Sequence, residues 1–463
     1  MEMHEYLDAL SGQIRSGRAR QAVREELEAH IRDQAQAYAD SGMEEQEALE
    51  QAVRQMGDPV EVGIDMDRIH RPRNGWKYLG IIAALSAAGL LAQYICIYRF
   101  GGDTLTGNSV GIQAFYRQCA YTLTGLAVMA GLYFCDYSLL SRYAKPVGAL
   151  FIAVTAVVCM PGFAPVVAGA HAYLKVILYM FIPLYGGILY RYRGSGIRGY
   201  VCALLWLGAA AWLALCRIRG GISVTIDVLF VCVLLLVLSL YRNWYGIRRR
   251  ALPAAATCAL AACLGAGVAL NLSDYQLRRL EVILNPRFAD RAYGYQTDVA
   301  REIAGRLKLV GGQMPERTPI HRLPGVQYDY ALLQTASVWG WLAAGVLLAI
   351  LALFLVSLFI MVKRQKNQLG QMIGFGCAAI LALESARYLL YNLGLGLMPA
   401  AGLPFLTYGR LHTVAVYALF GILLSIYRYQ DLIWETGNHR KSQGRGMTWG
   451  VGKYRIYIER ADS

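Results

Sequence analysis

Apolar runs of roughly 20 residues recur along this chain after Gly75. As α-helices, runs of this length cross a hydrocarbon core about 30 Å thick. Of the 463 residues, 56% are hydrophobic and only 16% are charged, whereas soluble domains average about 25% charged residues. The sequence therefore predicts an all-α polytopic membrane protein. We expect ten spans, near residues 77–98, 116–136, 146–161, 172–190, 199–216, 223–241, 252–270, 333–362, 371–393 and 411–427.

Residues 1–75 differ from the rest because they are rich in charge, and they predict a small soluble helical domain. Gly42 and Gly57 stand where helices are expected to end, and Asp58-Pro59 is typical of a helix start. The run Glu26-Leu27-Glu28-Ala29-His30-Ile31 with Met56-Gly57-Asp58-Pro59 resembles the helical prefix domain of bacterial permease-prefix proteins. We expect this domain to bind a cytoplasmic partner or the chain's own loops, and scattered surface charges explain Glu26, His30 and Asp33 better than a metal site does.

Basic residues are concentrated in alternate loops of the predicted membrane domain, 76–430, and the chain carries a net charge of +14. Under the positive-inside rule, these loops and both termini lie in the cytoplasm of a bacterial plasma-membrane protein. The polar interval 271–332 then lies outside, and the basic tail 431–463 lies inside. The charge is best explained by topology and by attraction to anionic membrane lipid, and no nucleic-acid partner is expected. The loop residues that set this orientation are Arg142, Lys145, Arg191, Arg193, Arg198, Arg242, Arg248, Arg249, Arg250, Lys363, Arg364 and Lys366.

The ten cysteines all lie in or beside apolar runs, and no two of them have CxxC spacing. We expect them to pack between helices as small apolar residues. The sequence therefore predicts no metal centre built from cysteines and no disulfide framework.

The outside loop holds the residue types that point to chemistry. Two amphipathic stretches, 277–284 and 297–309, predict helices at the membrane surface, with Gly294 as a turn signal between them. Asp329 follows, just before the chain becomes apolar. Partial burial there would suit a carboxylate to act as a general base. The competing interpretation is that Asp329 caps a helix N-terminus.

Two blocks of residues resemble the SEDS family, the FtsW/RodA/SpoVE group of shape, elongation, division and sporulation proteins. In the second block, the chain matches the family where it reads Asn392-Leu393-Gly394, Gly402-Leu403-Pro404-Phe405 and Thr407-Tyr408-Gly409. The matching residues of the first block are Asn285-Pro286, Asp290, Gly294-Tyr295-Gln296, Leu323-Pro324, Asp329 and Gly340.

The resemblance implies a glycosyltransferase that polymerises lipid II into the glycan strands of peptidoglycan. It also implies a class B penicillin-binding transpeptidase as partner, together with other cell-wall machinery. Asp329 takes the place of the family's loop aspartate and would act as the base. A divalent cation, Mg²⁺ or Mn²⁺, or basic side chains would stabilise the leaving pyrophosphate. The candidate substrate-binding residues are Lys175, Arg322, Arg410, Asn285, Gln296 and Tyr408.

The chain also departs from the family pattern. Gly325 stands where the family has Glu, and Ser337-Val338 stand for its Glu pair. These departures favour an alternative, a catalytically weakened scaffold or regulator of cell-wall synthesis. A third alternative is a lipid flippase or transporter, because charged residues occur within the spans. Among them, Glu384 and Arg387 are one helical turn apart, and we expect them to pair.

Overall fold

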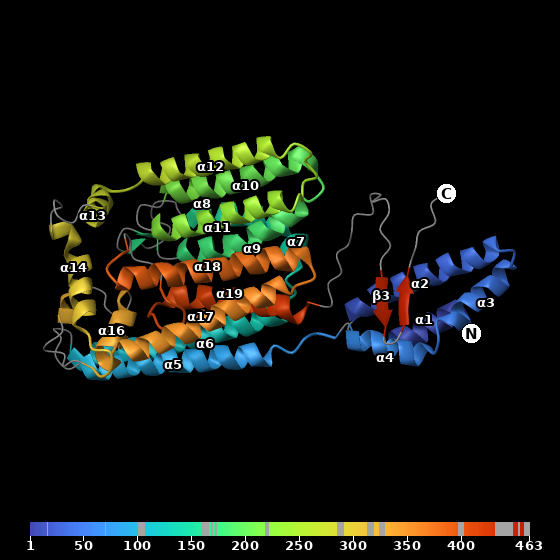
Figure 1. Ribbon diagram of the computed structural model, residues 1–463, viewed down its shortest axis with the longest axis horizontal. Coiled ribbons are helices and arrows are strands. Elements are labelled where there is room, and N and C mark those ends of the chain that lie inside the picture. Colours follow the sequence, from blue (N-terminus) through green and yellow to red (C-terminus); the bar gives the residue numbers. More distant parts are fainter. Residues whose placement is uncertain are drawn as a thin grey trace. The chain divides into compact units, whose positions relative to one another are not determined.

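The computed structural model is helical along most of its described length (Figure 1). It describes residues 1–15, 17–69, 71–100, 107–158, 166–167, 170–171, 174–217, 222–284, 291–312, 319–323, 329–396, 402–430, 448–451 and 454–457. Two short antiparallel hairpins are also present, β1 (Val166–Val167) with β2 (Ala170–His171) and β3 (Thr448–Val451) with β4 (Tyr454–Tyr457). The chain divides into two compact units, Met1–Ile433 and Trp434–Ser463, and the second of these contains β3 and β4.

The first four helices have a hydrophobic core of their own, as the charge-rich composition predicts. Tyr6, Leu10, Ile14 and Ile31 are among its buried residues. Gly42 and Gly57 end helices at positive φ, 101° and 84°, as expected. The side chain of Asp58 accepts a hydrogen bond from the main-chain N–H of Val60 at 3.2 Å, at the start of the fourth helix. These helices are α1 (Met3–Gly12), α2 (Gly17–Asp40), α3 (Glu45–Gln55) and α4 (Pro59–Ile69).

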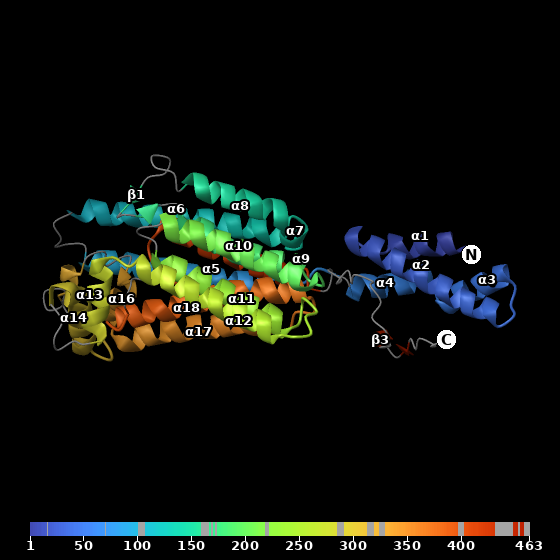
Figure 2. The same cartoon turned by 90° about the horizontal axis from the view of Figure 1, so that it is seen from above.

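The remaining long helices run side by side, and Figure 2 shows this bundle from above. Seven of the described helices are long and apolar enough to cross a membrane: α5, α10, α11, α12, α17, α18 and α19. The predicted all-α polytopic fold is confirmed. The helices of the bundle are α5 (Trp76–Phe100), α6 (Gly107–Phe134), α7 (Leu139–Arg142), α8 (Ala144–Val158), α9 (Leu174–Arg191), α10 (Gly196–Arg217), α11 (Ile222–Tyr241), α12 (Ala251–Leu270), α17 (Trp341–Lys363), α18 (Gln368–Asn392) and α19 (Arg410–Arg428).

Helices α6 and α19 form the most extensive pairing in the bundle. A Cβ atom added at Gly125 of α6 would lie 2.7 Å from the Tyr417 ring of α19. A Cβ atom at Gly421 of α19 would lie 2.8 Å from the main-chain oxygen of Met129. The backbones approach this closely because glycine has no side chain, which agrees with the expectation that glycine within the apolar runs serves packing.

The predicted span 333–362 is wrong as a single helix, because the structure breaks it at Gly340 into α16 (Ala331–Trp339) and α17. Gly340 has φ 88°, and an added Cβ would lie 2.7 Å from the carbonyl oxygen of Leu309. The break costs little hydrogen bonding, because the first amides of α17 find new partners. The N–H of Trp341 donates to the carbonyl of Lys308 at 3.1 Å, and that of Leu342 to Leu309 at 2.9 Å.

The segment between α12 and α17 gathers at one end of the bundle (Figures 1 and 2). It contains α13 (Asp274–Leu284), α14 (Arg291–Arg306) and the short 3-10 helix η2 (Pro319–Arg322). The predicted turn at Gly294 is wrong, because this residue lies inside α14. An added Cβ there would lie 2.7 Å from a methyl group of Val282, so the glycine lets α13 approach α14 closely. Buried side chains of α14 and η2 join Tyr330, Leu333 and Tyr391 in a hydrophobic cluster that anchors this segment to α16 and α18.

Candidate functional site

Asp329 lies at the point where the chain leaves the loop and enters the bundle. Asp329 is half-buried, whereas every residue from Ala331 to Val338 in the following helix α16 is buried. The N-cap position of α16 is taken by Tyr330 and not by Asp329. The predicted cap position at Asp329 therefore differs by one residue from the N-cap of α16. A half-buried carboxylate is accessible to a substrate and is also partly removed from water.

The end of α18 holds the main chain around Asp329 in place. The side-chain amide of Asn392 donates to the carbonyl of Asp329 at 2.9 Å and accepts from the N–H of Leu333 at 3.1 Å. The phenol oxygen of Tyr388 accepts from the N–H of Ala331 at 2.9 Å. The same Asn392 amide also donates to the Tyr388 carbonyl at 2.9 Å, which fixes its orientation. Two free N–H groups at the start of α16 are thereby satisfied by side chains of another helix.

An aromatic pair forms one wall beside Asp329. The rings of Tyr330 and Tyr391 stack with centroids 5.0 Å apart. The phenol of Tyr391 donates to the side-chain oxygen of Gln296 on α14 at 3.3 Å. Burial raises the pKa of Tyr330 well above its ordinary value, and the neighbouring Tyr391 raises it further. Both phenols therefore remain neutral hydrogen-bonding groups at neutral pH.

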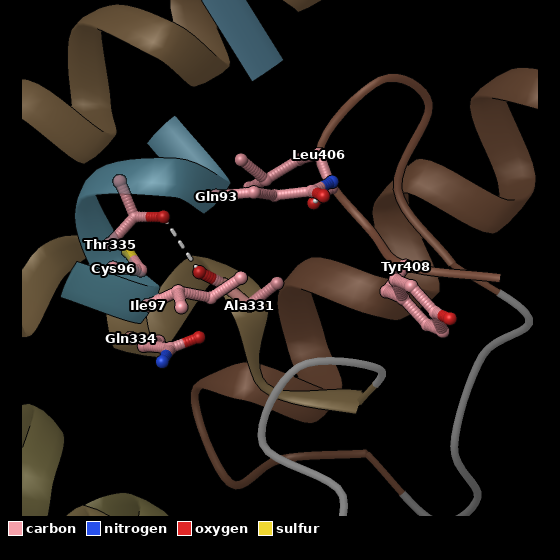
Figure 3. Close-up of a pocket in the computed structure, with 8 residues that line it drawn as sticks. All are labelled: Gln93, Cys96, Ile97, Ala331, Gln334, Thr335, Leu406 and Tyr408. Atoms are coloured by element: carbon pink, nitrogen blue, oxygen red, sulfur yellow. Dashed lines mark hydrogen bonds between the residues drawn. The ribbon is translucent and has the colours of Figure 1, made fainter. Parts of the chain in front are cut away.

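A small cavity of ≈ 20 Å³ lies on another side of α16 (Figure 3). It is close to the size of one water molecule. Gln93 crosses from α5 and donates to the carbonyl of Leu406 at 2.8 Å, which ties the 402–409 loop to the bundle. The remaining lining residues are Cys96, Ile97, Ala331, Gln334, Thr335 and Tyr408.

The structure brings some of the predicted site residues together. Gln296 reaches the aromatic pair beside Asp329, and Tyr408 shares the cavity with Ala331. Arg322 and Arg410 are exposed, on η2 and at the start of α19. The backbone of Lys175 lies in α9, whereas its side chain and the whole of Asn285 lie outside the described residues. The roles of all six remain predictions.

The predicted pairing of Glu384 with Arg387 is wrong, because each side chain turns to a different helix. Arg387 forms an ion pair with Asp227 of α11 and donates to the carbonyl of Ser223 at 3.0 Å. Glu384 lies 3.4 Å from Nε2 of His412 on α19. Packing between helices decides these partners, because both positions face the inside of the bundle.

Sequence reasoning attached no role to three residues of this region. In the sequence, Asn392 stands only as a motif residue, Tyr391 carries no predicted role, and Arg279 is one of the polar residues of an amphipathic stretch. A polar side chain near the end of an apolar span is a signal for Asn392, because such residues are costly in a membrane without partners. The burial of Arg279 has no sequence signal, since its neighbour Arg278 is exposed.

The described residues hold no group of three or more His, Cys, Asp or Glu side chains arranged to bind a metal ion. Asp329 is the carboxylate at this site, and the described residues around it do not fit a protein-built Mg²⁺ or Mn²⁺ centre.

Comparisons with known proteins agree with the fold and with the family resemblance. The family model of the FtsW/RodA/SpoVE cell cycle proteins matches residues 77–432. A probable peptidoglycan glycosyltransferase FtsW from Geobacter sulfurreducens is 23% identical over 334 residues, which cover 68% of this chain and 86% of the relative. The peptidoglycan glycosyltransferase MrdB of Escherichia coli is 25% identical over 169 residues, which cover 35% of this chain and 44% of the relative.

Two solved structures share the fold. A chain from a peptidoglycan synthase complex, studied for the coordination of polymerization and crosslinking, has a TM-score of 0.57 at 20% identity and covers 77% of this chain and 98% of its own. The rod shape determining protein RodA of Thermus thermophilus has a TM-score of 0.50 at 17% identity and covers 77% of this chain and 97% of its own. Because the identities are low, the solved structures support the fold alone. The family model matches most of the sequence and supports membership of the family. This chain belongs to the FtsW/RodA/SpoVE family of cell cycle proteins.

Proposed function

We propose that the protein is a peptidoglycan glycosyltransferase that polymerises lipid II, with Asp329 as its general base. One observation carries the assignment of the base: the main chain of Asp329 is clamped by Asn392, so that a half-buried carboxylate is presented at a fixed place. The relatives' names, peptidoglycan glycosyltransferases FtsW and MrdB, support the reaction class. The site lies on the outer face of a bacterial plasma membrane, with both termini in the cytoplasm, if the basic loops face inward.

The reaction is an inverting transfer between two lipid-linked sugars. The acceptor sugar hydroxyl attacks the anomeric carbon of the donor, and a new glycosidic bond forms. The bond from that carbon to the pyrophosphate oxygen breaks, and undecaprenyl pyrophosphate leaves with the electron pair. The hydroxyl proton passes to Asp329, which returns it to water after the product moves on. A base positioned within hydrogen-bonding distance of the hydroxyl typically contributes about 100- to 10,000-fold to such a step.

The oxygens of the leaving pyrophosphate gain negative charge as the bond breaks, and positively charged groups must stabilise it. Arg322 and Arg410 are exposed and supply guanidinium groups that suit phosphate oxygens. Lys175 is the third proposed contact, and Asn285, Gln296 and Tyr408 complete the proposed substrate-binding set. Any Mg²⁺ or Mn²⁺ would be carried largely by the pyrophosphate itself, as is usual for Mg²⁺ with phosphate substrates.

A class B penicillin-binding transpeptidase is the proposed partner, because glycan strands must be crosslinked after they are made. The similar chain from a complex that couples polymerization with crosslinking supports this partner. The charge-rich domain 1–75 is proposed to bind a further cytoplasmic component, and the division of the chain at residues 75 and 430 remains part of this proposal.

The deciding experiment is polymerisation of fluorescent lipid II by the purified protein, alone and with a co-expressed transpeptidase. Wild type is compared with Asp329→Ala and Asp329→Asn. Asp298→Ala is the matched control, because it removes an exposed carboxylate from the same end of the bundle. Glycan ladders that vanish only in the Asp329 variants support the enzyme and its base.

Other results of the same experiment favour other functions. Ladders that persist in Asp329→Ala rule out this residue as the base. If well-folded wild type makes no ladder, either alone or with the transpeptidase, the result favours the scaffold or regulator. In that case, deletion of residues 1–72 is expected to disturb the cell wall while Asp329→Ala is silent. Translocation of labelled lipid that depends on Glu384 or Asp227 would favour the flippase.

A further inference from the structure

Arg279 is the only buried arginine or lysine among the described residues, with 6% of its surface exposed. It follows directly on Arg278, which is exposed on the same helix α13. Burial of a guanidinium is costly unless nearby groups stabilise its charge. The fold accepts this cost at one position, close to the proposed site, and Arg279 is not needed to make α13 helical.

The guanidinium of Arg279 faces the aromatic wall. Its carbon Cζ lies 5.9 Å from the centre of the Tyr391 ring, within the range of a cation–π interaction. Tyr391 stacks in turn on Tyr330, the residue that follows Asp329. A buried cation and two stacked rings therefore follow one another, and the half-buried Asp329 is the residue that precedes the second ring in the chain.

The charges of Arg279 and Asp329 act on the same phenol. Burial is the main cause of the raised pKa of Tyr330, Arg279 lowers this pKa, and Asp329 raises it. Two opposite charges that both act on one buried group also act on each other. Their attraction is stronger here than in water, because Arg279, Tyr330 and Tyr391 are all buried.

We propose that Arg279 is a positioning residue that keeps Asp329 ionised, and therefore ready to accept a proton, while it fixes the Tyr391–Tyr330 wall. The proposal rests on the function proposed above for Asp329. Partial burial alone would favour the neutral carboxylic acid, which cannot act as a base. Arg279 offsets that effect without touching the substrate, since its side chain is covered.

The other ionisable groups around Asp329 cannot supply this charge equally well. Tyr330, Tyr388 and Tyr391 are buried phenols that are neutral at neutral pH. Arg322 on η2 is exposed, so water and salt screen it. Arg301 on α14 is half-buried, and its side-chain stem lies against Gly394, 2.6 Å from where a Cβ atom would be.

The test compares Arg279→Gln and Arg279→Lys with the matched control Arg278→Gln, in the full-length protein. The first readout is the pH profile of lipid II polymerisation. We expect Arg279→Gln to move the acid-side midpoint to higher pH by about one unit. Activity should recover on the alkaline side, and Arg279→Lys should keep the wild-type midpoint. Arg278→Gln should leave the profile unchanged.

The second readout measures ionisation without activity. A hydrophobic carbodiimide reacts with protonated carboxyl groups, and mass spectrometry gives the extent of labelling at Asp329 as a function of pH. Labelling of Arg279→Gln should begin at higher pH than labelling of wild type, by the same shift. Unchanged midpoints in both readouts would overturn the inference while the glycosyltransferase stands. A shift in labelling with no polymer from wild type would keep the role of Arg279 and remove the proposed reaction.

Discussion

The side-chain amide of Asn392 donates a hydrogen bond of 2.9 Å to the main-chain carbonyl of Asp329, although 63 positions separate the two residues. The oxygen of the same amide accepts a hydrogen bond from the N–H of Leu333. Asn392 therefore bridges the residues on both sides of the start of α16. The end of one span thus sets where the loop carboxylate stands. This relationship makes the site sensitive to changes in α18 that touch no substrate.

Replacement of Asn392 by Ala should therefore reduce polymerisation about 10- to 100-fold, because the carboxylate loses its fixed position. The free energy of unfolding should fall by about 1–3 kcal/mol, since the N–H of Leu333 is left buried without its partner. Polymerisation rates per folded protein and thermal unfolding measure the two effects. Tyr200→Phe is the control, because it removes buried hydrogen bonds to Pro253 and Thr257 elsewhere in the bundle. Equal activity losses in both variants would argue against a specific role for Asn392.

Gly340→Ala should destabilise the protein by about 1–3 kcal/mol, because the backbone has φ 88° and the new Cβ would clash with the carbonyl of Leu309. Gly345→Ala, one turn further along α17, has open space around its Cβ and should be neutral or slightly stabilising. Thermal unfolding of the two variants side by side checks this. If Gly340→Ala unfolds like wild type, then the break between α16 and α17 is not fixed by this residue.

In the ion pair of Asp227 with Arg387, loss of one partner should destabilise the protein more than replacement of both partners by apolar residues. Asp227→Asn removes one partner and should cost about 3 kcal/mol, because Arg387 remains in a largely covered site. The double variant with Asp227→Leu and Arg387→Met should be more stable than Asp227→Asn, since no charge is left unpaired. Glu28→Gln breaks the exposed pair with Arg32 and should cost less than about 1 kcal/mol. Denaturant unfolding of the four proteins gives the comparison, and a cost at Asp227 no larger than at Glu28 would contradict the prediction.

The N-terminal helices α1–α4 should lose stability in alkali through Tyr6. Burial, with a smaller effect of Asp58, raises the pKa of Tyr6 from 10.0 to about 12. Between these two values the unfolded chain has released the phenol proton while the folded chain still holds it. Stability therefore falls as pH rises through this window, by up to about 3 kcal/mol, and is unaffected by this group below it.

Tyr6→Phe removes the titrating group and should abolish that part of the alkaline loss, although it also loses the hydrogen bond to the carbonyl of Met56. Proteolysis of residues 1–69 within the full-length protein, followed as a function of pH, measures the difference. The same pH dependence in wild type and Tyr6→Phe would mean that another group is responsible.

The helices of the bundle were predictable because each is decided locally. A long apolar run satisfies its backbone within one helix, and Gly42 and Gly57 end their helices by their own conformational freedom. The resemblance of the residues around Asp329 and Asn392 likewise identified the family from sequence. Gly294 and Gly340 show where local reasoning fails. Gly294 is predicted as a turn but lies inside a helix, and Gly340 is predicted inside a helix but lies at a break. Close approach of the Val282 side chain explains the first, and close approach of the Leu309 carbonyl explains the second.

Local sequence patterns identify the helical class, most of the apolar helices and the family, but they do not reveal the division of the predicted span 333–362 into α16 and α17. Tertiary structure alone decided which polar groups meet: Asp227 with Arg387, Asn392 with Asp329, and Arg279 rather than Arg278 beneath the aromatic wall. The physical reason is the range of the interactions. Helix formation depends on neighbours within a few residues, whereas a buried charge or amide is satisfied by whichever helix packs against it.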